Sequence, residues 1–259
     1  RDLKDIISSD LECKITIPES SIKSWKSQFE DNQGLFESTP KKLKLNNVDK
    51  IDLSRVEPIS RKFGFDLGTP VDRYYIENFL SKNSHLIIGN VLEFDNDIYA
   101  RKFGNNSCSI DILSPVKTPK STIVGDLCNS SNFPENRYNC IICTQTIQVI
   151  FDIQSAIENL IKALLPGGNL ILTVSGISQI SRYDYERWGE YWRLTEKTLT
   201  KLAENCSNCE NAKIMSFGNL PVAKAFLDGI PAEFLQESVL DHEDKDFQLI
   251  ICGILRKQN

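Results

Sequence analysis

The chain has 259 residues, and 30 Lys plus Arg stand against 35 Asp plus Glu, a formal net charge of −5. Hydrophobic residues make up 41% and charged residues 25%, which are globular values and exclude a wholly disordered or fibrous protein. The acidic balance argues against nucleic-acid binding, because neutralising phosphates needs clustered cations. Only two His leave little room for a histidine metal site or His-based catalysis, and we predict no metal.

The cysteines and the first residues of the sequence both favour a protein from a reducing environment. No apolar run reaches the roughly 18–20 residues of a membrane span, and the first residues do not resemble a secretory signal. We therefore expect a cytoplasmic protein with mostly reduced cysteines. Cys140 and Cys143 lie in a strand-like run, where a two-residue period should point them to opposite faces. Cys206 and Cys209 could hold half a zinc site or form a disulfide, but no second pair completes a metal site.

The first half of the chain divides into an extension and the start of a domain. Residues 1–60 are polar and predict a partly helical N-terminal extension, with a helical stretch at 22–29 and a Lys-rich patch at 41–44. A domain is predicted over 61–259, beginning with a helix at 73–82. Five β-like runs follow, at 85–94, 108–113, 121–127, 138–150 and 168–174.

The second half alternates helices with strands. A helical pattern over 152–165 has Asp152 as a plausible N-cap and ends at Pro166-Gly167-Gly168. After an aromatic loop at 176–194, the pattern predicts a helix at 195–205, a strand at 212–217, a helical insertion at 221–236 and a last strand at 247–255. Strands that are apolar throughout and alternate with helices indicate an α/β fold, with a mainly parallel sheet covered on both faces.

Acidic residues fall at the predicted ends of three strands. Glu93 ends the first, Asp111 the second and Asp126 the third, where open α/β sheets bind ligands. An acid after the second strand can accept both hydroxyls of a ribose. An acid after the third can accept from an adenine amino group, with Leu127 as backbone donor and apolar shelf. Strand-end Asp residues also commonly cap turns, so each alone has a structural explanation.

Several stretches resemble the class I S-adenosylmethionine (SAM)-dependent methyltransferases over residues 61–259. Val91-Leu-Glu-Phe-Asp95 is similar to the first motif, residues 133–143 to the approach to the fourth strand, and Leu164-Leu-Pro-Gly-Gly-Asn-Leu-Ile-Leu-Thr-Val174 to the fifth strand. Residues 185–195 are similar to a segment of bacterial enzymes that tailor glycans and small molecules. The resemblance implies SAM as cofactor and a Rossmann-like, seven-stranded, mostly parallel sheet with an antiparallel last strand and helices on both faces.

The first motif departs from the family pattern Glu-x-Gly-x-Gly-x-Gly. It reads Glu93-Phe-Asp95-Asn-Asp97-Ile-Tyr99, so every glycine position is replaced. Asp95 or Asp97 could pair with the amino group of SAM or favour its sulfonium charge. Equally, the loop could have lost cofactor binding, which would leave a binding or scaffold protein of the same fold. Arg73 and Tyr74 precede the motif on a helix that could contact SAM or could simply dock on the sheet.

The remaining candidates belong to the acceptor side and the chemistry. Thr144, Gln145 and Gln148 place hydroxyl and amide groups beside the expected methyl position, although they also suit a strand and its polar end. Asp184 or Glu186 could act as a base on a hydroxyl acceptor. Aromatic rings and Arg guanidinium groups suit a sugar or an anionic, partly planar acceptor. Several such residues lie close together in the aromatic loop: Tyr183, Arg187, Trp188, Tyr191, Trp192 and Arg193. Trp188 and Trp192 could instead cover the core. We therefore expect methylation of an oxygen of a small molecule or glycan.

Overall fold

The computed structural model describes residues 55–129 and 133–259. The helical stretch predicted at 22–29 and the Lys-rich patch at 41–44 lie outside the described residues. Residues 55–60, placed in the extension by the sequence, lie against the end of a later helix, because the Ile59 and Ser60 N–H groups donate to the Asp228 carbonyl at 2.9 and 3.1 Å. Within the described ranges, no helix combines the length and apolar character that crossing a bilayer requires.

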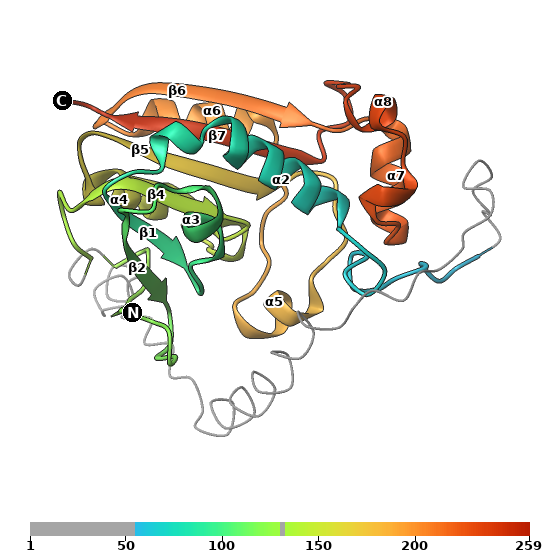
Figure 1. The fold of residues 1–259 in the computed structure, drawn as a ribbon, viewed down its shortest axis with the longest axis horizontal. Helices are drawn as coiled ribbons and strands as arrows, with labels where there is room; N and C mark the ends of the chain where they lie inside the picture. The colour runs from blue at the N-terminus through green and yellow to red at the C-terminus, as the bar shows by residue number, and fades with distance from the viewer. Residues whose placement is uncertain (1–54, 130–132) are drawn as a thin grey trace, which may run out of the picture. The chain divides into compact units, whose positions relative to one another are not determined.

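The strands of the described chain form one seven-stranded sheet of order β3-β2-β1-β4-β5-β7-β6 (Figure 1). Pairing is parallel from β3 through β5, whereas β7 is antiparallel to both β5 and β6. The predicted fold class is thereby confirmed. The strands are β1 Asn90–Phe94, β2 Ser109–Ser114, β3 Ile123–Val124, β4 Tyr138–Thr144, β5 Leu164–Ser175, β6 Cys209–Phe217 and β7 Ile250–Lys257.

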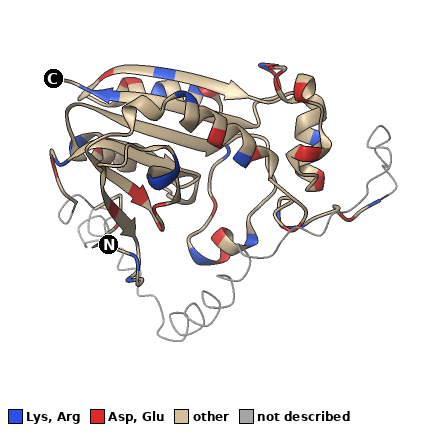
Figure 2. Cartoon of the chain, viewed as in Figure 1, with Lys and Arg blue, Asp and Glu red and all other residues tan. Residues whose placement is uncertain are grey.

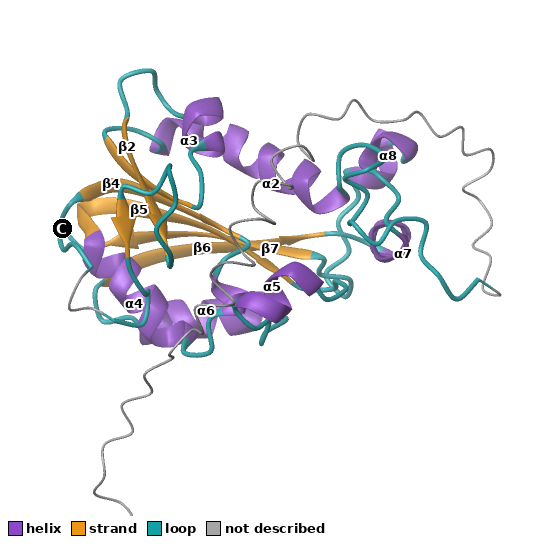
Figure 3. Cartoon of the chain, turned by 90° about the horizontal axis from the view of Figure 1, so that it is seen from below, coloured by secondary structure: helices purple, strands orange, loops and turns teal. Residues whose placement is uncertain are grey.

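Helices cover both faces of this sheet. They are α2 Val71–Lys82, α3 Ile98–Phe103, α4 Ile153–Ala163, α5 Arg182–Arg187, α6 Glu196–Asn205, α7 Leu220–Asp228 and α8 Glu237–Leu240. Figure 3 shows α2 and α3 on one side of the sheet and α4 and α6 on the other. The core is accordingly split into two clusters of buried side chains, one on each face. Cys143 belongs to one cluster and Cys140 to the other, which confirms that they point to opposite faces.

The sequence also determines where α4 begins and ends. The Asp152 side chain accepts from the Ser155 N–H at 3.1 Å, so the predicted N-cap is confirmed. The helix stops at Ala163, two residues earlier than predicted, because Leu164 already pairs with Tyr138 as the start of β5. The Pro-Gly-Gly stretch therefore lies inside a strand irregularity, where Gly167 has a φ of 72°.

Two strand boundaries differ from the prediction for a common reason. The first strand begins at residue 90 and not 85, and the fourth ends at 144 and not 150, because 3-10 turns occupy Ser84–Leu86 and Ile147–Val149. An apolar run alone does not distinguish a strand from a tight turn. The aromatic loop contains α5, whose N-cap Ser181 accepts from the Asp184 N–H. Both acidic and basic residues lie on this short helix (Figure 2).

Replacement of the α4 cap tests this local assignment. Asp152→Ala should lower the free energy of unfolding by about 1 kcal/mol, because one N–H of the first turn loses its acceptor. Asp152→Asn should stay close to wild type in urea unfolding, since an amide oxygen can also cap. Equal losses in both variants would contradict a capping role.

Candidate functional site

The site is organised around the point where the strand order reverses, between β1 and β4. Glu93 of β1 lies opposite Ile142 of β4, so the residues that follow Phe94 and Thr144 emerge side by side at the carboxyl edge. Open α/β sheets bind their ligands in the crevice at this position. Ligand-binding groups are therefore expected on the two turns that leave these strands.

Both of those turns begin with a left-handed residue. Four non-glycine residues of the described chain have positive φ, and two of them are Asp95 at 61° and Gln145 at 50°. A left-handed conformation costs a non-glycine residue roughly 1–2 kcal/mol, less for Asp. Strain of this kind persists where surrounding structure enforces it, often at functional sites. The switch point is thus flanked by strained residues on both sides.

Glu93 stabilises the turn from inside. Its side chain is 2% exposed, and its carboxylate accepts the N–H groups of Tyr99 at 3.0 Å and Ala100 at 2.7 Å. Burial raises the pKa of Glu93 to about 7, although these two hydrogen bonds act in the opposite direction. Both carboxylate oxygens of Glu93 accept backbone N–H groups of α3, so Glu93 holds the start of that helix in place.

Asp95 directly follows β1 and is exposed. Its N–H donates to the Leu113 carbonyl at 3.0 Å, and its carboxylate accepts from the Ser114 hydroxyl at 3.2 Å. The backbone of Asp97 and Tyr99 is not left-handed, because Asp97 has a φ of −117° and Tyr99 lies within α3. Of Asp95, Asp97 and Tyr99, only Asp95 therefore carries the steric cost of a left-handed backbone.

The prediction that Asp111 ends the second strand is wrong. β2 continues to Ser114, three residues further, which is about 10 Å at strand spacing. The Asp111 carboxylate is held by Arg137 at 2.6 Å and by the Tyr138 hydroxyl at 3.0 Å, both from the opposite, amino-terminal end of β4. Asp111 therefore fastens β2 to β4 and is not brought to the ligand edge. Ser114 is the side chain that ends β2, and the sequence analysis missed it.

Asp126 and Leu127 do lie just beyond the end of β3. The Asp126 carboxylate accepts from the Cys128 N–H at 2.9 Å, a turn-capping contact, and the residue is otherwise exposed. Leu127 is buried, and its carbonyl accepts from the Asn159 side chain at 2.8 Å. Asp126 thus caps a turn, and this contact uses only one of its two carboxylate oxygens.

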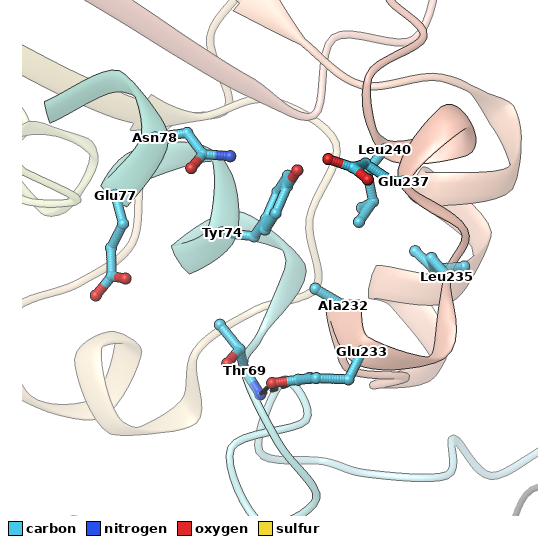
Figure 4. A pocket seen from close by; sticks show the side chains of 9 residues that line it. All are labelled: Thr69, Tyr74, Glu77, Asn78, Ala232, Glu233, Leu235, Glu237 and Leu240. Atoms are coloured by element: carbon cyan, nitrogen blue, oxygen red, sulfur yellow. Dashed lines mark hydrogen bonds between the residues drawn. The ribbon is translucent and has the colours of Figure 1, made fainter. Parts of the chain in front are cut away.

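The start of α2 contacts the turn after β1 through Arg73. The Arg73 guanidinium donates to the Tyr99 hydroxyl and lies over the rings of Phe65 and Tyr99 at 5.7 and 5.8 Å. Its buried Nε has no hydrogen-bond partner among the described residues. Tyr74 instead lines a groove of about 400 Å³ between α2 and the segment leading into α8. Figure 4 shows the side chains of Tyr74 and Glu237 directed toward one another across it.

On the β4 side, two glutamines form a compact amide cluster. Gln145 directly follows β4, and its Oε1 accepts from Gln148 Nε2 at 2.9 Å and from the Ser175 hydroxyl at 2.6 Å. Gln148 is 5% exposed, and Ser175 ends β5. Thr144 is the last residue of β4 and is half-buried. Ser175 was not among the sequence candidates, because nothing local indicates that β5 ends beside Gln145.

The α5 segment contributes charge close to Asp95. The pKa of Asp95 is raised, first by the protein atoms crowding its carboxyl group and then by the charge of Asp184. Asp184 is half-buried in the first turn of α5, whereas Glu186 is exposed. The Arg187 guanidinium stacks on the Tyr183 ring at 3.6 Å, so these two predicted acceptor contacts pair with each other.

The loop after α5 mixes supporting and exposed side chains. The Trp192 indole N–H donates to the Ile150 and Phe151 carbonyls at 3.0 and 3.2 Å, and its ring packs against the core. Arg193 binds Glu190 at 2.7 Å and is likewise an internal brace. Tyr191, 52% exposed, makes an edge contact with Phe151, which is 70% exposed and was not predicted.

Trp188 follows α5, where its N–H donates to the Asp184 carbonyl at 2.8 Å.

Within the described ranges, no group of three or more His, Cys, Asp or Glu side chains is arranged to hold a metal ion. Cys206 and Cys209 are free thiols. The polar groups at the switch point are therefore carboxylates, amides and hydroxyls.

Comparison with known proteins identifies the fold. No protein-family model matches the chain, and no curated protein sequence matches it significantly. Among solved structures, it is similar to phosphoethanolamine N-methyltransferase 2 of Haemonchus contortus, in complex with phosphomonomethylethanolamine and S-adenosylhomocysteine. The TM-score is 0.50 and the identity 13%, over 76% of this chain and 56% of that chain. The shared fold is that of the class I SAM-dependent methyltransferases.

Two further similar structures have lower TM-scores. A SAM-dependent methyltransferase from Archaeoglobus fulgidus gives 0.47 at 10% identity, over 71% of this chain and 94% of that chain. The N-methyltransferase NodS of Bradyrhizobium japonicum, in complex with S-adenosylhomocysteine, gives 0.46 at 15% identity, over 74% and 89%. The chain thus spans little more than half of the Haemonchus enzyme and most of the other two.

The strain at Asp95 can be measured with a pair of substitutions that both remove the carboxylate. Asp95→Gly should be more stable than Asp95→Ala by about 1–2 kcal/mol in urea unfolding, because only glycine adopts this φ without a steric penalty. Equal stabilities would show that the turn relaxes away from the left-handed conformation.

Ionisation of Glu93 should make stability depend on pH. Its pKa is about 7 in the folded chain and 4.5 in the ordinary state, so the folded chain holds the proton more tightly between these values. The free energy of unfolding should then fall as pH rises from 4.5 to 7, by up to about 3 kcal/mol. Glu93→Gln should flatten this slope, whereas Glu204→Gln, at an exposed site on α6, should not.

Proposed function

We propose that this chain is a SAM-dependent methyltransferase whose acceptor is a hydroxyl group of a small molecule or glycan. One observation carries the proposal: the two turns at the switch point between β1 and β4 both begin with strained, polar residues, Asp95 and Gln145. The fold shared with known methyltransferases supports it. Such turns are where a ligand of an open α/β sheet is expected.

The residues at this edge fit a positively charged cofactor. When bound, SAM supplies a methyl group on a sulfonium, and its C–S bond breaks as a bond to the acceptor oxygen forms. The exposed carboxylate of Asp95 would pair with the ammonium group of SAM, which S-adenosylhomocysteine also carries. The unpartnered Nε of Arg73 would serve a negatively charged group nearby, and Thr144 would line the same edge. Glu93 would act indirectly by fixing the turn.

The nucleoside end would lie toward β3. Asp126 would accept from the adenine amino group with its exposed carboxylate, and Leu127 would provide a backbone donor and an apolar side chain, which is buried. Asp111 has no part in this proposal, since its carboxylate is bound to Arg137. Tyr74 lines the groove beside α8 and is proposed as a peripheral contact.

Proton removal falls to α5. As the bond to the acceptor oxygen forms, the hydroxyl proton would pass to a carboxylate. Asp184 is the better candidate, because its charge contributes to the raised pKa of Asp95 and it therefore lies near the turn after β1. Glu186 is exposed and would serve only if α5 moved. Tyr183 and Tyr191 expose aromatic faces for the acceptor, with Arg187 and Trp188 beside them, whereas Trp192 and Arg193 support the loop from within.

A binding protein without catalysis is the second candidate. It is favoured by the replaced glycines: the Tyr99 N–H is already bound by Glu93, and the Tyr99 side chain is buried. A scaffold of this kind would keep the sheet and both core clusters but would have no need for strained residues at the switch point.

Calorimetric titration with S-adenosylhomocysteine separates the two. Asp95→Asn, which keeps the tolerance for a left-handed backbone, should weaken binding about tenfold through loss of one charge-assisted contact. Asp111→Asn is the matched control and should change affinity less than twofold. No binding by the wild type at millimolar ligand would refute the enzyme, and an equal effect of both substitutions would refute the role of Asp95.

A further inference from the structure

The amide cluster at the end of β4 has an unusual hydrogen-bond balance. Gln145 Oε1 accepts twice, from Gln148 and from Ser175. Gln145 Nε2 and Gln148 Oε1 are buried and have no partner among the described residues. A buried polar group without a partner costs about 1–3 kcal/mol. The cluster therefore holds one amide NH₂ group and one amide oxygen that make no hydrogen bond within the described residues.

This imbalance does not depend on how the amides are oriented. Turning one amide alone would bring two oxygens or two NH₂ groups together, so Gln145 and Gln148 can only turn as a pair. With both turned, Gln145 donates to Gln148 and Ser175, and the unused groups become the Gln145 oxygen and the Gln148 NH₂. One donor and one acceptor are left over in either arrangement.

The backbone of both glutamines is held in place by hydrogen bonds. Gln145 is held at a φ of 50°, and its N–H donates to the Thr173 carbonyl at 2.8 Å. The Gln148 carbonyl accepts the N–H groups of Tyr191 and Trp192 at 2.9 and 3.3 Å. Strain and unmatched polar atoms thus coincide beside the Asp95 turn, where the methyl group would be delivered.

We propose that Gln145 and Gln148 receive the neutral hydroxyl group of the methyl acceptor, an inference that rests on the proposed methyl transfer. A hydroxyl donates once and accepts at its oxygen, so it satisfies both unused groups together. An ammonium group only donates and would face the unused amide N–H. A carboxylate only accepts and would face the unused amide oxygen. The cluster therefore selects a neutral acceptor over either charged one.

Side-chain amide NMR signals of ¹⁵N-labelled protein report on this directly. The unmatched atoms are buried, so the probes must be small: ethanol, ethylammonium chloride and sodium acetate at matched ionic strength, with and without saturating S-adenosylhomocysteine. Ethanol should shift the signals of both Gln145 and Gln148 saturably, and the two ions should not. Equal shifts from all three, or from an ion alone, would overturn the inference, as would no shift at all, the behaviour of a cluster that only holds an internal water.

Substitutions separate recognition from a structural role. Gln148→Glu should lose the ethanol response and respond to ethylammonium at pH 7.5. The Gln145 NH₂ group then turns to donate to the new carboxylate, so the unused groups are acceptors and carry a negative charge. Gln148→Leu should lose the ethanol response while its melting temperature without ligand stays equal to wild type or rises. A fall in melting temperature together with a retained ethanol response at Gln145 would mean that the glutamines serve the fold.

A matched glutamine provides the control. Gln154 on α4 also has a buried, unpartnered oxygen, but its NH₂ contacts the Glu158 carboxylate at 3.0 Å and not the amide cluster. Gln154→Leu should leave the ethanol response of Gln145 and Gln148 unchanged. If the amides respond to ethanol in a protein that does not bind S-adenosylhomocysteine, the recognition site stands and the methyltransferase proposal falls.

Discussion

The parallel pairing of β1 with β4 is the constraint on which the site depends. Both strands lie in the middle of the sheet with buried side chains on both faces, so neither can shift along its axis without exposing apolar surface. Their carboxyl ends are consequently fixed side by side. The chain leaves each strand through a left-handed residue, Asp95 after β1 and Gln145 after β4. Packing of the sheet supplies the energy that keeps both turns strained.

The buried Glu93 side chain also holds the turn that follows β1 in one conformation. A carboxylate in an apolar surrounding is unfavourable, and its elevated pKa reflects that cost. Two backbone N–H groups of the next helix partly offset it and hold the turn against the end of β1. The turn therefore needs no glycine flexibility to keep one shape.

How much the sequence could predict depended on the range of the interactions involved. The cap at Asp152 and the opposed cysteines of β4 were predictable, because a hydrogen bond three residues away and a two-residue period are local properties. The pairing of Asp111 was not, since nothing near it indicates that Arg137 and Tyr138, 26 and 27 residues later in the chain, bind its carboxylate. The meeting of Ser175 with Gln145 depends on the register between β4 and β5, which no single segment contains.

The two sides of the switch point also differ in electrostatic character. In the proposed reaction, this difference would decide where the methyl donor and the acceptor bind. Carboxylates gather on the β1 side, where Asp95 lies within the field of Asp184, so a cation is stabilised there. The β4 side offers amide and hydroxyl groups without net charge, and their unused donor and acceptor favour a neutral partner. A positively charged donor and a neutral acceptor would then be drawn to adjacent places by different forces. Alignment of the two reactants would follow from the fixed spacing of β1 and β4 and would not require the donor and acceptor to attract one another.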